Sequence, residues 1–303
     1  MDAGGANAIE VRGLVKRYGR FQALHGIDLD VHAGEAFGFI GPNGAGKTTV
    51  IRILLDLLRP SEGEVRVFGL DSRADTRRIH ARLGYVPGDL TLWEKMTGRD
   101  VLEFLANMRG GAGAERIEPL AERLNLTLDR RIKELSRGNR EKVGLIQAFM
   151  HEPDLLVLDE PTSGLDPLVQ HEVFAMVDAA TERGATVFFS SHYLNEVERI
   201  ADRVGLIREG RMLTVDTVAG LKRRAKRRVD VTFTEPVDPA PLEALRGAGD
   251  VRAAPNRVEL TFTGEMAELI AALAEMPVEV LTTPEPDLEE VFLGLYGGGG
   301  DAA

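Results

Sequence analysis

Short apolar runs alternate with longer segments of helical spacing through the first two thirds of the chain. Ala36–Ile40 is an apolar run that ends at a glycine-rich loop, and Thr48–Leu58 then has apolar residues at helical spacing. Leu155–Leu158 and Thr186–Ser190 are short and carry apolar residues on both faces, as buried parallel strands do. The alternation over residues 9–216 predicts an α/β fold, in which helices flank a parallel sheet.

Two segments depart from this alternation. Leu92–Arg137 is mostly helical in pattern with a break at Gly110–Gly113, which predicts a helical insertion, about residues 92–137, into the sheet domain. Lys222–Arg228 has six basic residues in seven and indicates a domain boundary. A solvated helix end or linker and a contact with anionic lipid headgroups are two interpretations of this basic segment.

The region after the basic segment predicts a second, smaller domain. Residues 229–296 have the pattern of a ferredoxin-like α/β accessory domain, and no catalytic constellation is found in it. Residues 1–8 and 297–303 are expected to be flexible tails. The expected strands are Val229–Phe233, Arg257–Phe262 and Val278–Thr282, and the expected helices lie near Pro241–Ala248, Glu265–Glu275 and Pro286–Tyr296.

Composition narrows the class of protein. A length of 303 residues suits two domains. The absence of cysteine excludes disulfides and thiolate zinc sites and fits a reducing cytoplasm. The net charge of −11 argues against nucleic acid as a partner. No apolar run reaches the roughly 18 residues that a membrane span needs, and the first residues lack the pattern of a secretion signal.

A phosphate-binding motif follows the first buried strand. Residues 41–48 match G-x-x-x-x-G-K-[ST] in the strand–loop–helix setting that this P-loop motif requires. Glycines allow the backbone to wrap closely around phosphates, and the helix N-terminus favours anions. Lys47 is expected to contact the β- and γ-phosphates of a nucleotide, and the Thr48 hydroxyl to bind Mg²⁺. The predicted nucleotide-binding residues here are Gly41, Pro42, Asn43, Gly44, Ala45, Gly46, Lys47, Thr48 and Thr49.

Two carboxylates end the second buried strand. Asp159 is expected to join Thr48 at the Mg²⁺ ion, and Glu160 to orient or deprotonate the water that attacks the γ-phosphate. Taken alone, Asp-Glu after an apolar strand also fits a capped strand end.

Further motifs occur in a characteristic order around these two. Leu135–Asn139 reads L-S-R-G-N and resembles the signature motif of ABC-family ATPases. Ser163–Asp166 resembles their D-loop and Ser190–His192 their H-loop, while Tyr18 matches the A-loop aromatic. Residues 9–216 therefore resemble an ABC-family ATP-binding subunit.

The resemblance implies a catalytic site shared between two copies of the chain. Ser136, Arg137, Gly138 and Asn139 would cap the γ-phosphate of ATP held by the P-loop of the second copy, and Asp166 belongs to the same nucleotide site. His192 would contact the γ-phosphate and hold the attacking water in line, so that Lys47, Glu160 and His192 form the catalytic set. Tyr18 would stack on adenine, although a hairpin aromatic also fits a core position.

The sequence also departs from the family pattern. Arg137 and Asn139 stand where the signature motif usually has glycine and glutamine, and Gly88 stands where the Q-loop has glutamine. Water or Asp89 is expected to substitute for that glutamine. Trp93 follows shortly after, either as a buried structural residue or as an exposed mark of a partner's docking groove.

The C-terminal region is similar to the accessory domain of ABC-2 drug- and antibiotic-resistance exporters, chiefly through Asp287–Leu293. This similarity implies a peripheral ATPase at the cytoplasmic face of the cell membrane that powers integral-membrane permease subunits, for export of a drug, antibiotic or other small hydrophobic compound. The alternatives are a soluble ABC ATPase of DNA repair, chromosome organisation or translation, and a binding module without catalysis. The chain has a single cassette and no coiled-coil heptads, which disfavours a soluble ABC ATPase of this kind. The presence of Lys47, Glu160 and His192 disfavours a module without catalysis.

Overall fold

The chain divides into two compact units, Met1–Asp216 and Thr217–Ala303. The computed structural model describes residues 6–224, 227–284, 288, 289, 291 and 292. No helix within this described part is both long enough and apolar enough to cross a membrane.

The first elements of the first unit form an antiparallel sheet. Its strands are β1 (Asn7–Tyr18), β2 (Phe21–His32), β4 (Glu62–Val67) and β5 (Leu70–Asp71), in the order β2-β1-β4-β5. β1 and β2 form a hairpin that closes with Tyr18 opposite Phe21. Asn7 and Ala8 already belong to β1, and Ala8 is buried, so the expected flexible tail is two residues too long. Backbone pairing with β2 and β4 holds this start in place.

The second sheet of this unit has six strands in the order β10-β9-β3-β8-β7-β6. β9, β3, β8, β7 and β6 are parallel to one another. Every residue of β3, β7 and β8 is buried, as expected for strands covered on both faces. The strands are β3 (Ala36–Ile40), β6 (Leu83–Val86), β7 (Leu155–Asp159), β8 (Thr186–Ser191), β9 (Arg203–Arg208) and β10 (Arg211–Thr217).

One apolar core joins the two sheets through helix α1 (Lys47–Leu54). Val50, Ile51 and Ile53 of α1 are buried among side chains of β1, β2 and β4 and of β3, β7 and β8. This packing fixes the start of α1 against the ends of the parallel strands, where the P-loop lies.

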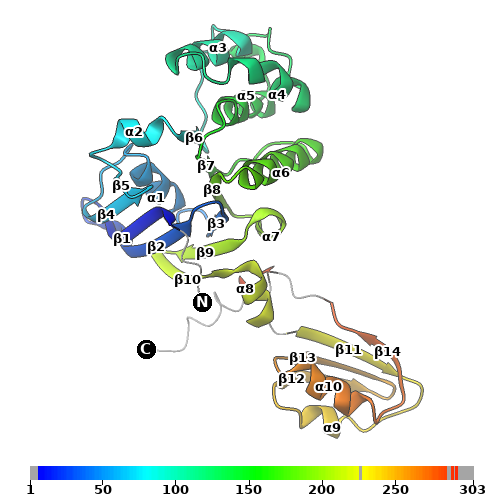
Figure 1. Ribbon diagram of the computed structural model, residues 1–303. Coiled ribbons are helices and arrows are strands. Elements are labelled where there is room, and N and C mark those ends of the chain that lie inside the picture. Colours follow the sequence, from blue (N-terminus) through cyan, green and yellow to red (C-terminus); the bar gives the residue numbers. More distant parts are fainter. Residues whose placement is uncertain (1–5, 225–226, 285–287, 290, 293–303) are drawn as a thin grey trace. The chain divides into compact units, whose positions relative to one another are not determined.

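The remaining helices of the first unit surround the parallel sheet. Figure 1 shows α3, α4 and α5 together at one end of the unit, with the antiparallel sheet at the other. Helix α3 begins at a capping box, in which Thr97 and Asp100 each bond the other's backbone N–H. The segment expected as a helical insertion holds α3, η1, α4 and η2. The helices are α2 (Thr76–His80), α3 (Gly98–Met108), η1 (Ala114–Arg116), α4 (Ile117–Arg123), η2 (Ile132–Glu134), α5 (Arg137–Phe149), α6 (Pro167–Glu182) and α7 (Leu194–Ile200).

The second unit has the element order βαββαβ after a first helix, α8 (Val218–Arg224). Its sheet is antiparallel in the order β12-β13-β11-β14, which is the arrangement of ferredoxin-like domains. Leu242 of α9 and Leu269 of α10 pack on the apolar face of this sheet. The elements are β11 (Arg227–Phe233), α9 (Ala240–Glu243), β12 (Ala248–Ala254), β13 (Arg257–Phe262), α10 (Met266–Leu273) and β14 (Val278–Thr282).

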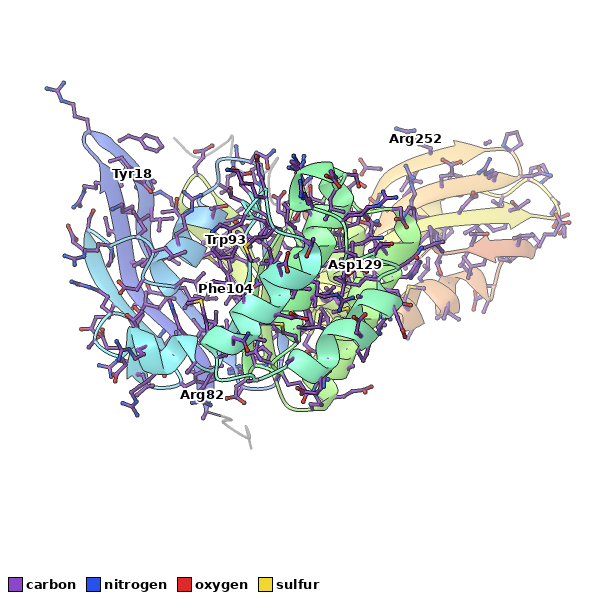
Figure 2. The ribbon with its side chains drawn as sticks, turned by 90° about the horizontal axis from the view of Figure 1, so that it is seen from above. Tyr18, Arg82, Trp93, Phe104, Asp129 and Arg252 are labelled. Atoms are coloured by element: carbon purple, nitrogen blue, oxygen red, sulfur yellow. The ribbon has the colours of Figure 1, made fainter. Side chains whose placement is uncertain are left out.

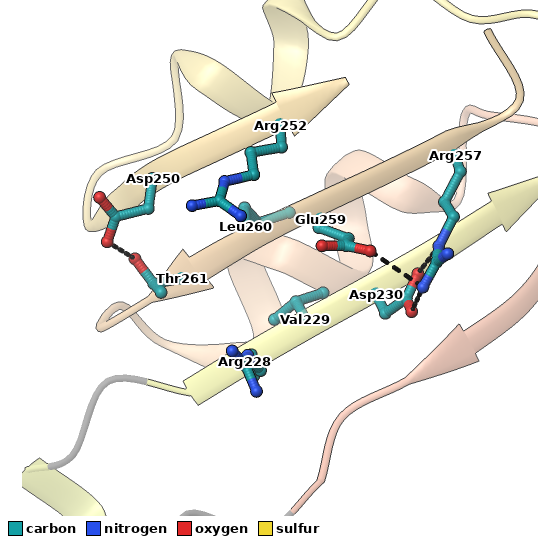
Figure 3. A pocket seen from close by; sticks show the side chains of 9 residues that line it. All are labelled: Arg228, Val229, Asp230, Asp250, Arg252, Arg257, Glu259, Leu260 and Thr261. Atoms are coloured by element: carbon teal, nitrogen blue, oxygen red, sulfur yellow. Dashed lines mark hydrogen bonds and ion pairs between the residues drawn. The ribbon is translucent and has the colours of Figure 1, made fainter. Parts of the chain in front are cut away.

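The opposite face of this sheet is charged. Arg257 forms ion pairs with Asp230 at 2.5 Å and with Glu259 at 2.9 Å, and Thr261 donates a hydrogen bond to Asp250 (Figure 3). The Arg257 guanidinium lowers the pKa of Asp230 through this hydrogen-bonded pair. The alternation of buried apolar and exposed charged residues along β11 and β13 thus gives the sheet one covered face and one open face.

Of the expectations for the second unit, some differ from the structure, one agrees with it, and some lie outside the described residues. The helix expected at Pro241–Ala248 shortens to α9, and β12 is a strand that the pattern did not predict. Within Lys222–Arg228, α8 ends and β11 begins, which agrees with the helix-end interpretation. The helix expected at Pro286–Tyr296 lies mostly outside the described residues, and the tail 297–303 lies entirely outside them.

Candidate active site

The loop between β3 and α1 is built for close backbone approach. A Cβ atom on Gly41 would lie 2.3 Å from the carbonyl oxygen of Ile207, and one on Gly46 would lie 2.8 Å from the side chain of Leu24. Gly46 also has φ +108°, which non-glycine residues rarely adopt. Glycine is therefore required at both positions, and the loop delivers backbone N–H groups and the α1 N-terminus to one point.

Lys47 is the buried cation of this loop, with only 5% of its surface exposed. Its Nζ donates hydrogen bonds to the carbonyl oxygens of Gly41 at 2.6 Å and Pro42 at 3.3 Å, and lies 3.6 Å from Oε1 of Glu160. Burial lowers the pKa of Lys47, while the charges of Glu160 and Asp159 act in the opposite direction. The ammonium group thus lies beside both carboxylates.

Asp159, at the end of β7, is held by two hydroxyl groups. Thr48 Oγ1 donates to its Oδ2 at 2.9 Å, and Ser190 Oγ donates to its Oδ1 at 2.5 Å. Asp159 and Ser190 are both buried. The carboxylate is therefore fixed in one orientation, with the Thr48 hydroxyl beside it.

Glu160 and His192 meet across the ends of β7 and β8. His192 Nδ1 lies 3.2 Å from Glu160 Oε1, and both side chains are partly exposed. Glu160 adopts a left-handed backbone conformation, with φ +53°, which is uncommon for a residue with a side chain. Its N–H donates to the Ser190 backbone oxygen at 3.2 Å and to Ser190 Oγ at 3.1 Å, and these bonds support the strained turn.

The signature segment lies at the start of α5 (Arg137–Phe149). Ser136 caps the helix by accepting a hydrogen bond from the Asn139 N–H at 3.3 Å. A Cβ on Gly138 would lie 3.1 Å from the carbonyl oxygen of Gly164, so the signature segment and the D-loop pack together. Asp166 caps α6 by accepting from the Val169 N–H at 3.1 Å.

Arg137 extends from this helix start into solvent. Two thirds of its side chain is exposed, and its Nε lies 3.7 Å from Glu141. Burial raises the pKa of the Glu141 carboxyl, and the charge of Asp89 adds to the rise. In the described part of the chain no hydrogen bond or ion pair joins residues 136–139 or Asp166 to the P-loop.

Gly88 and Tyr18 take defined places around the site. A Cβ on Gly88 would lie 3.3 Å from Oδ2 of Asp159, so the Q-loop segment adjoins the fixed carboxylate. Asp89 is exposed, and its charge contributes to the raised pKa of Glu141 in α5. Tyr18 is 48% exposed at the hairpin end, and therefore the core interpretation of this aromatic is wrong (Figure 2).

An apolar groove runs from the end of β6 to α3. Trp93 is half exposed, so its interpretation as a buried structural residue is wrong, and it packs edge-to-face on Phe104 at 5.5 Å between ring centroids (Figure 2). The groove has a volume of about 330 Å³. Its apolar lining is Leu55, Leu57, Leu83, Tyr85, Pro87, Leu90, Leu92, Trp93 and Leu105.

Two polar residues near the site were missed as side chains of interest. Ser190 contacts both Asp159 and Glu160, and Glu196 of α7 is a buried carboxylate. A hydroxyl within the apolar run of β8 was a signal for the first. A glutamate on the buried face of α7 was a signal for the second.

The fold and this cluster define a P-loop nucleotide hydrolase. Phosphate-bond hydrolysis requires a site that binds phosphate, a metal ligand and a group that directs water. The glycine loop with its buried lysine, the hydroxyl beside a fixed carboxylate, and the second carboxylate paired with histidine match these three parts. A match to the ABC transporter family covers residues 24–163.

Similarity to known proteins extends over nearly the whole chain. It is 31% identical over 301 residues to the bacitracin transport ATP-binding protein BcrA of Enterococcus faecalis, with 97% of this chain and 98% of that protein covered. It is 34% identical over 305 residues to the daunorubicin/doxorubicin resistance ATP-binding protein DrrA of Streptomyces peucetius, with 96% and 92% covered. A solved ATP-binding subunit of an ABC transporter superimposes with a TM-score of 0.67 at 29% identity, with 71% of this chain and 92% of that chain covered.

The chain therefore belongs to the family of ABC transporter ATP-binding subunits, and it is an ATPase. The predicted family resemblance, the ABC ATPase fold and the enzyme class are confirmed.

Proposed function

We propose that this chain binds and hydrolyses ATP between two copies of itself and powers a separate membrane permease that exports a drug, antibiotic or other small hydrophobic compound. The observation that carries the catalytic part is the meeting of Lys47, Thr48, Asp159, Glu160 and His192 at the ends of adjacent parallel strands. Full-length similarity to transport and resistance ATP-binding proteins supports the export part.

The P-loop holds the phosphates. Backbone N–H groups of residues 41–49 and the α1 N-terminus provide hydrogen bonds and a favourable dipole for an anion. Lys47 exchanges its bonds to the Gly41 and Pro42 carbonyl oxygens for bonds to the β- and γ-phosphates. Phosphate charge stabilises the buried ammonium, whose pKa burial otherwise lowers. At the hairpin end, the exposed ring of Tyr18 stacks on adenine.

Thr48 and Asp159 fit a Mg²⁺ ion. A hydroxyl and a carboxylate oxygen 2.9 Å apart form a hard-oxygen pair, and Mg²⁺ prefers one or two such protein ligands together with phosphate oxygens and water. The ion would supply charge neutralisation at the β- and γ-phosphates.

Glu160 and His192 direct the attacking water. Glu160 accepts a proton as the water oxygen bonds to the γ-phosphorus, and the bond from that phosphorus to the β–γ bridging oxygen breaks to release ADP. His192, 3.2 Å from Glu160, holds this carboxylate in place and contacts the γ-phosphate. Ser190 keeps Asp159 and the Glu160 backbone in register for this step.

The second copy completes the site. Ser136, Arg137, Gly138 and Asn139 present a helix N-terminus, a hydroxyl and an exposed guanidinium, which suit the γ-phosphate of ATP bound by the other copy. Asp166 contributes by capping α6 and ordering the D-loop beside Gly138. Two ATP molecules then bridge a symmetric dimer.

The apolar groove beside Trp93 receives a helix of the permease. An exposed aromatic pair at a groove of this kind is typical of a protein interface. The groove also adjoins the catalytic site, because Pro87 lines it and a Cβ on the next residue, Gly88, would lie 3.3 Å from Asp159 Oδ2. Burial and the charge of Asp159 raise the pKa of Tyr85, which also lines the groove, to about 12. A helix that moves in the groove can thus shift the end of β6, and with it Gly88 beside Asp159.

Replacement of Trp93 tests this docking surface. We expect Trp93→Ala to leave the ATPase rate and melting temperature of the isolated subunit unchanged, because the side chain is half exposed. Its binding to the permease should weaken by about 2 kcal/mol, as for an aromatic interface anchor, so stimulation of its ATPase by the permease should fall. The measurements are thermal melting of the isolated subunit, and ATPase of the isolated subunit and of the complex titrated with permease.

A matched control is Met108→Ala, which removes a 70% exposed apolar side chain from α3 outside the groove lining. It should not change stimulation by the permease. A lowered melting temperature of isolated Trp93→Ala, as for a truncated core aromatic, would contradict the docking role.

The second unit adjusts the dimer or the docking of the permease and holds none of the nucleotide residues. We expect a chain that ends at Thr217 to fold and bind ATP with unchanged affinity, because Met1–Asp216 is a compact unit with its own core. Nucleotide titration and thermal melting of the truncated chain check this. A folded truncation that no longer binds ATP would show that the nucleotide site extends past the boundary.

We place the chain at the cytoplasmic face of the membrane, and its export function is tested on the complete transporter. The subunit is purified with its native permease, reconstituted in vesicles and supplied with ATP and a candidate drug. ATP-dependent accumulation of the drug, lost in Lys47→Ala, supports the proposal. A chain that neither binds a membrane permease nor supports transport would refute it.

A further inference from the structure

Glu196 of α7 is a buried carboxylate that the mechanism above does not use. Only 6% of its surface is exposed. Its Oε1 accepts a hydrogen bond from Thr162 Oγ1 at 2.5 Å, and its Oε2 accepts one from Ser191 Oγ at 2.8 Å. Among the residues whose placement is described, no lysine or arginine lies within ion-pair distance of it. A buried carboxylate without a cation is costly, so its two hydroxyl partners are its main compensation.

The two hydroxyls belong to different loops of the active site. Thr162 follows Glu160 by two residues and leads into the D-loop, while Ser191 directly precedes His192. Both side chains are almost fully buried, at 2% and 1% exposure. Ser191 Oγ also accepts the Tyr193 N–H at 2.9 Å, which orders the backbone on the far side of His192. One carboxylate therefore joins the loop of Glu160 to the loop of His192.

The relative position of these loops decides whether Glu160 and His192 can act together. Their side chains meet at a single 3.2 Å contact, and Glu160 lies on a backbone turn with φ +53°. A small shift of either loop lengthens that contact. The loop after Glu160 also contacts the signature segment, since Gly164 packs on Gly138. A movement of the signature segment can therefore shift this loop.

We propose that Glu196 is a positioning residue for ATP hydrolysis. Through Thr162 and Ser191 it holds the segment after Glu160 against the segment that carries His192, and it transmits a movement of the D-loop to His192. This inference rests on the proposed roles of Glu160 and His192. It assigns Glu196 no contact with the nucleotide.

Isosteric substitution separates positioning from folding. In Glu196→Gln the side chain keeps its shape, while one carboxylate oxygen becomes an NH₂ group that cannot accept a hydrogen bond. We expect kcat to fall about tenfold, because a slight misplacement of catalytic groups is enough for such a loss, while KM stays within about twofold. Thr162→Val removes one partner hydroxyl and should lower kcat in the same way. The double variant Thr162→Val with Glu196→Gln should be no slower than the slower single variant, because both changes break the same link.

Two further variants serve as controls. Glu182→Gln makes the same chemical change at an exposed position of α6 and should leave kcat unchanged. Glu196→Asp keeps the carboxylate on a shorter side chain and should recover part of the kcat lost in Glu196→Gln. ATP affinity and melting temperature are measured for every variant.

The inference is overturned if Glu196→Gln turns over at the normal rate, or if kcat falls only together with ATP affinity and melting temperature. If Glu196→Gln does not fold, Thr162→Val and Glu196→Asp still decide, since a normal kcat in both refutes the link. Failure of the proposed mechanism is distinguishable, because Glu160→Gln would then retain turnover in the same assay.

Discussion

Glu160→Gln is expected to bind ATP normally and to hydrolyse it about a thousandfold more slowly, as for the loss of a general base. The amide keeps the size of the side chain but cannot accept the proton of the attacking water. The carboxylate lies 3.6 Å from Lys47 Nζ and 3.2 Å from His192 Nδ1, so the substitution acts on the group at the centre of the site.

The same variant should accumulate as a dimer held by ATP, because hydrolysis is the step that releases the two copies. Sizing chromatography with and without ATP measures the dimer, and a phosphate-release assay measures turnover. Glu182→Gln, an equivalent change at an exposed position of α6, is the control and should behave as the unmodified chain. A Glu160→Gln chain that stays monomeric with ATP, or that hydrolyses it at a normal rate, would remove Glu160 from its proposed role.

The P-loop and the strand ends could be predicted from the sequence because their physical causes are local. Glycines at fixed spacing, a lysine and a hydroxyl residue are needed wherever backbone wraps phosphate. A fully apolar run that ends in Asp159 predicts a buried parallel strand with its carboxylate at the sheet edge. The geometry then requires Gly41 and Gly46, where a Cβ would overlap neighbouring atoms.

The hydroxyl–carboxylate links could not be predicted in the same way. Ser190 contacts Asp159 and Glu160 from positions 31 and 30 residues away in the sequence, and Glu196 contacts Thr162 from 34 residues away. Only the pairing of β7 with β8 and the packing of α7 bring these residues together. A pattern of single residues does not indicate which buried polar groups will meet.

Strand β12 was not predicted, for a different reason. Its sequence, Ala-Gly-Asp-Val-Arg-Ala-Ala, is poor in β-branched and aromatic residues, so local propensity does not favour a strand. Pairing with β13 forms it nevertheless, with Ala253 opposite Val258 and Ala254 opposite Arg257. Tertiary hydrogen bonding therefore overrides local preference at this sheet edge.

A dimer that mixes two inactive variants is expected to recover ATPase activity. Lys47→Ala removes the P-loop cation, and Gly138→Asp places a carboxylate where the signature segment faces a γ-phosphate. Two like charges about 4 Å apart repel by about 4 kcal/mol at an effective dielectric of about 20, so the Gly138→Asp homodimer should be nearly inactive. The Lys47→Ala homodimer should be nearly inactive because neither of its P-loops has a cation for the phosphates. In the mixed dimer both lesions fall in one site, and the other site has an intact P-loop and an intact signature segment.

Random mixing in equal amounts makes about half of the dimers mixed, each with one of two sites intact, so recovery should reach about a quarter of the unmodified rate if the two sites act independently. Gly138→Ala is the steric control, because a Cβ at this position already lies 3.1 Å from the Gly164 carbonyl oxygen. If Gly138→Ala is as inactive as Gly138→Asp, crowding of the D-loop explains the loss and the charge does not. Two affinity tags on the two variants establish that subunits exchange. Under proven exchange, a mixture with no activity above that of the homodimers means that each P-loop works with the signature segment of its own copy, and the shared site is then wrong.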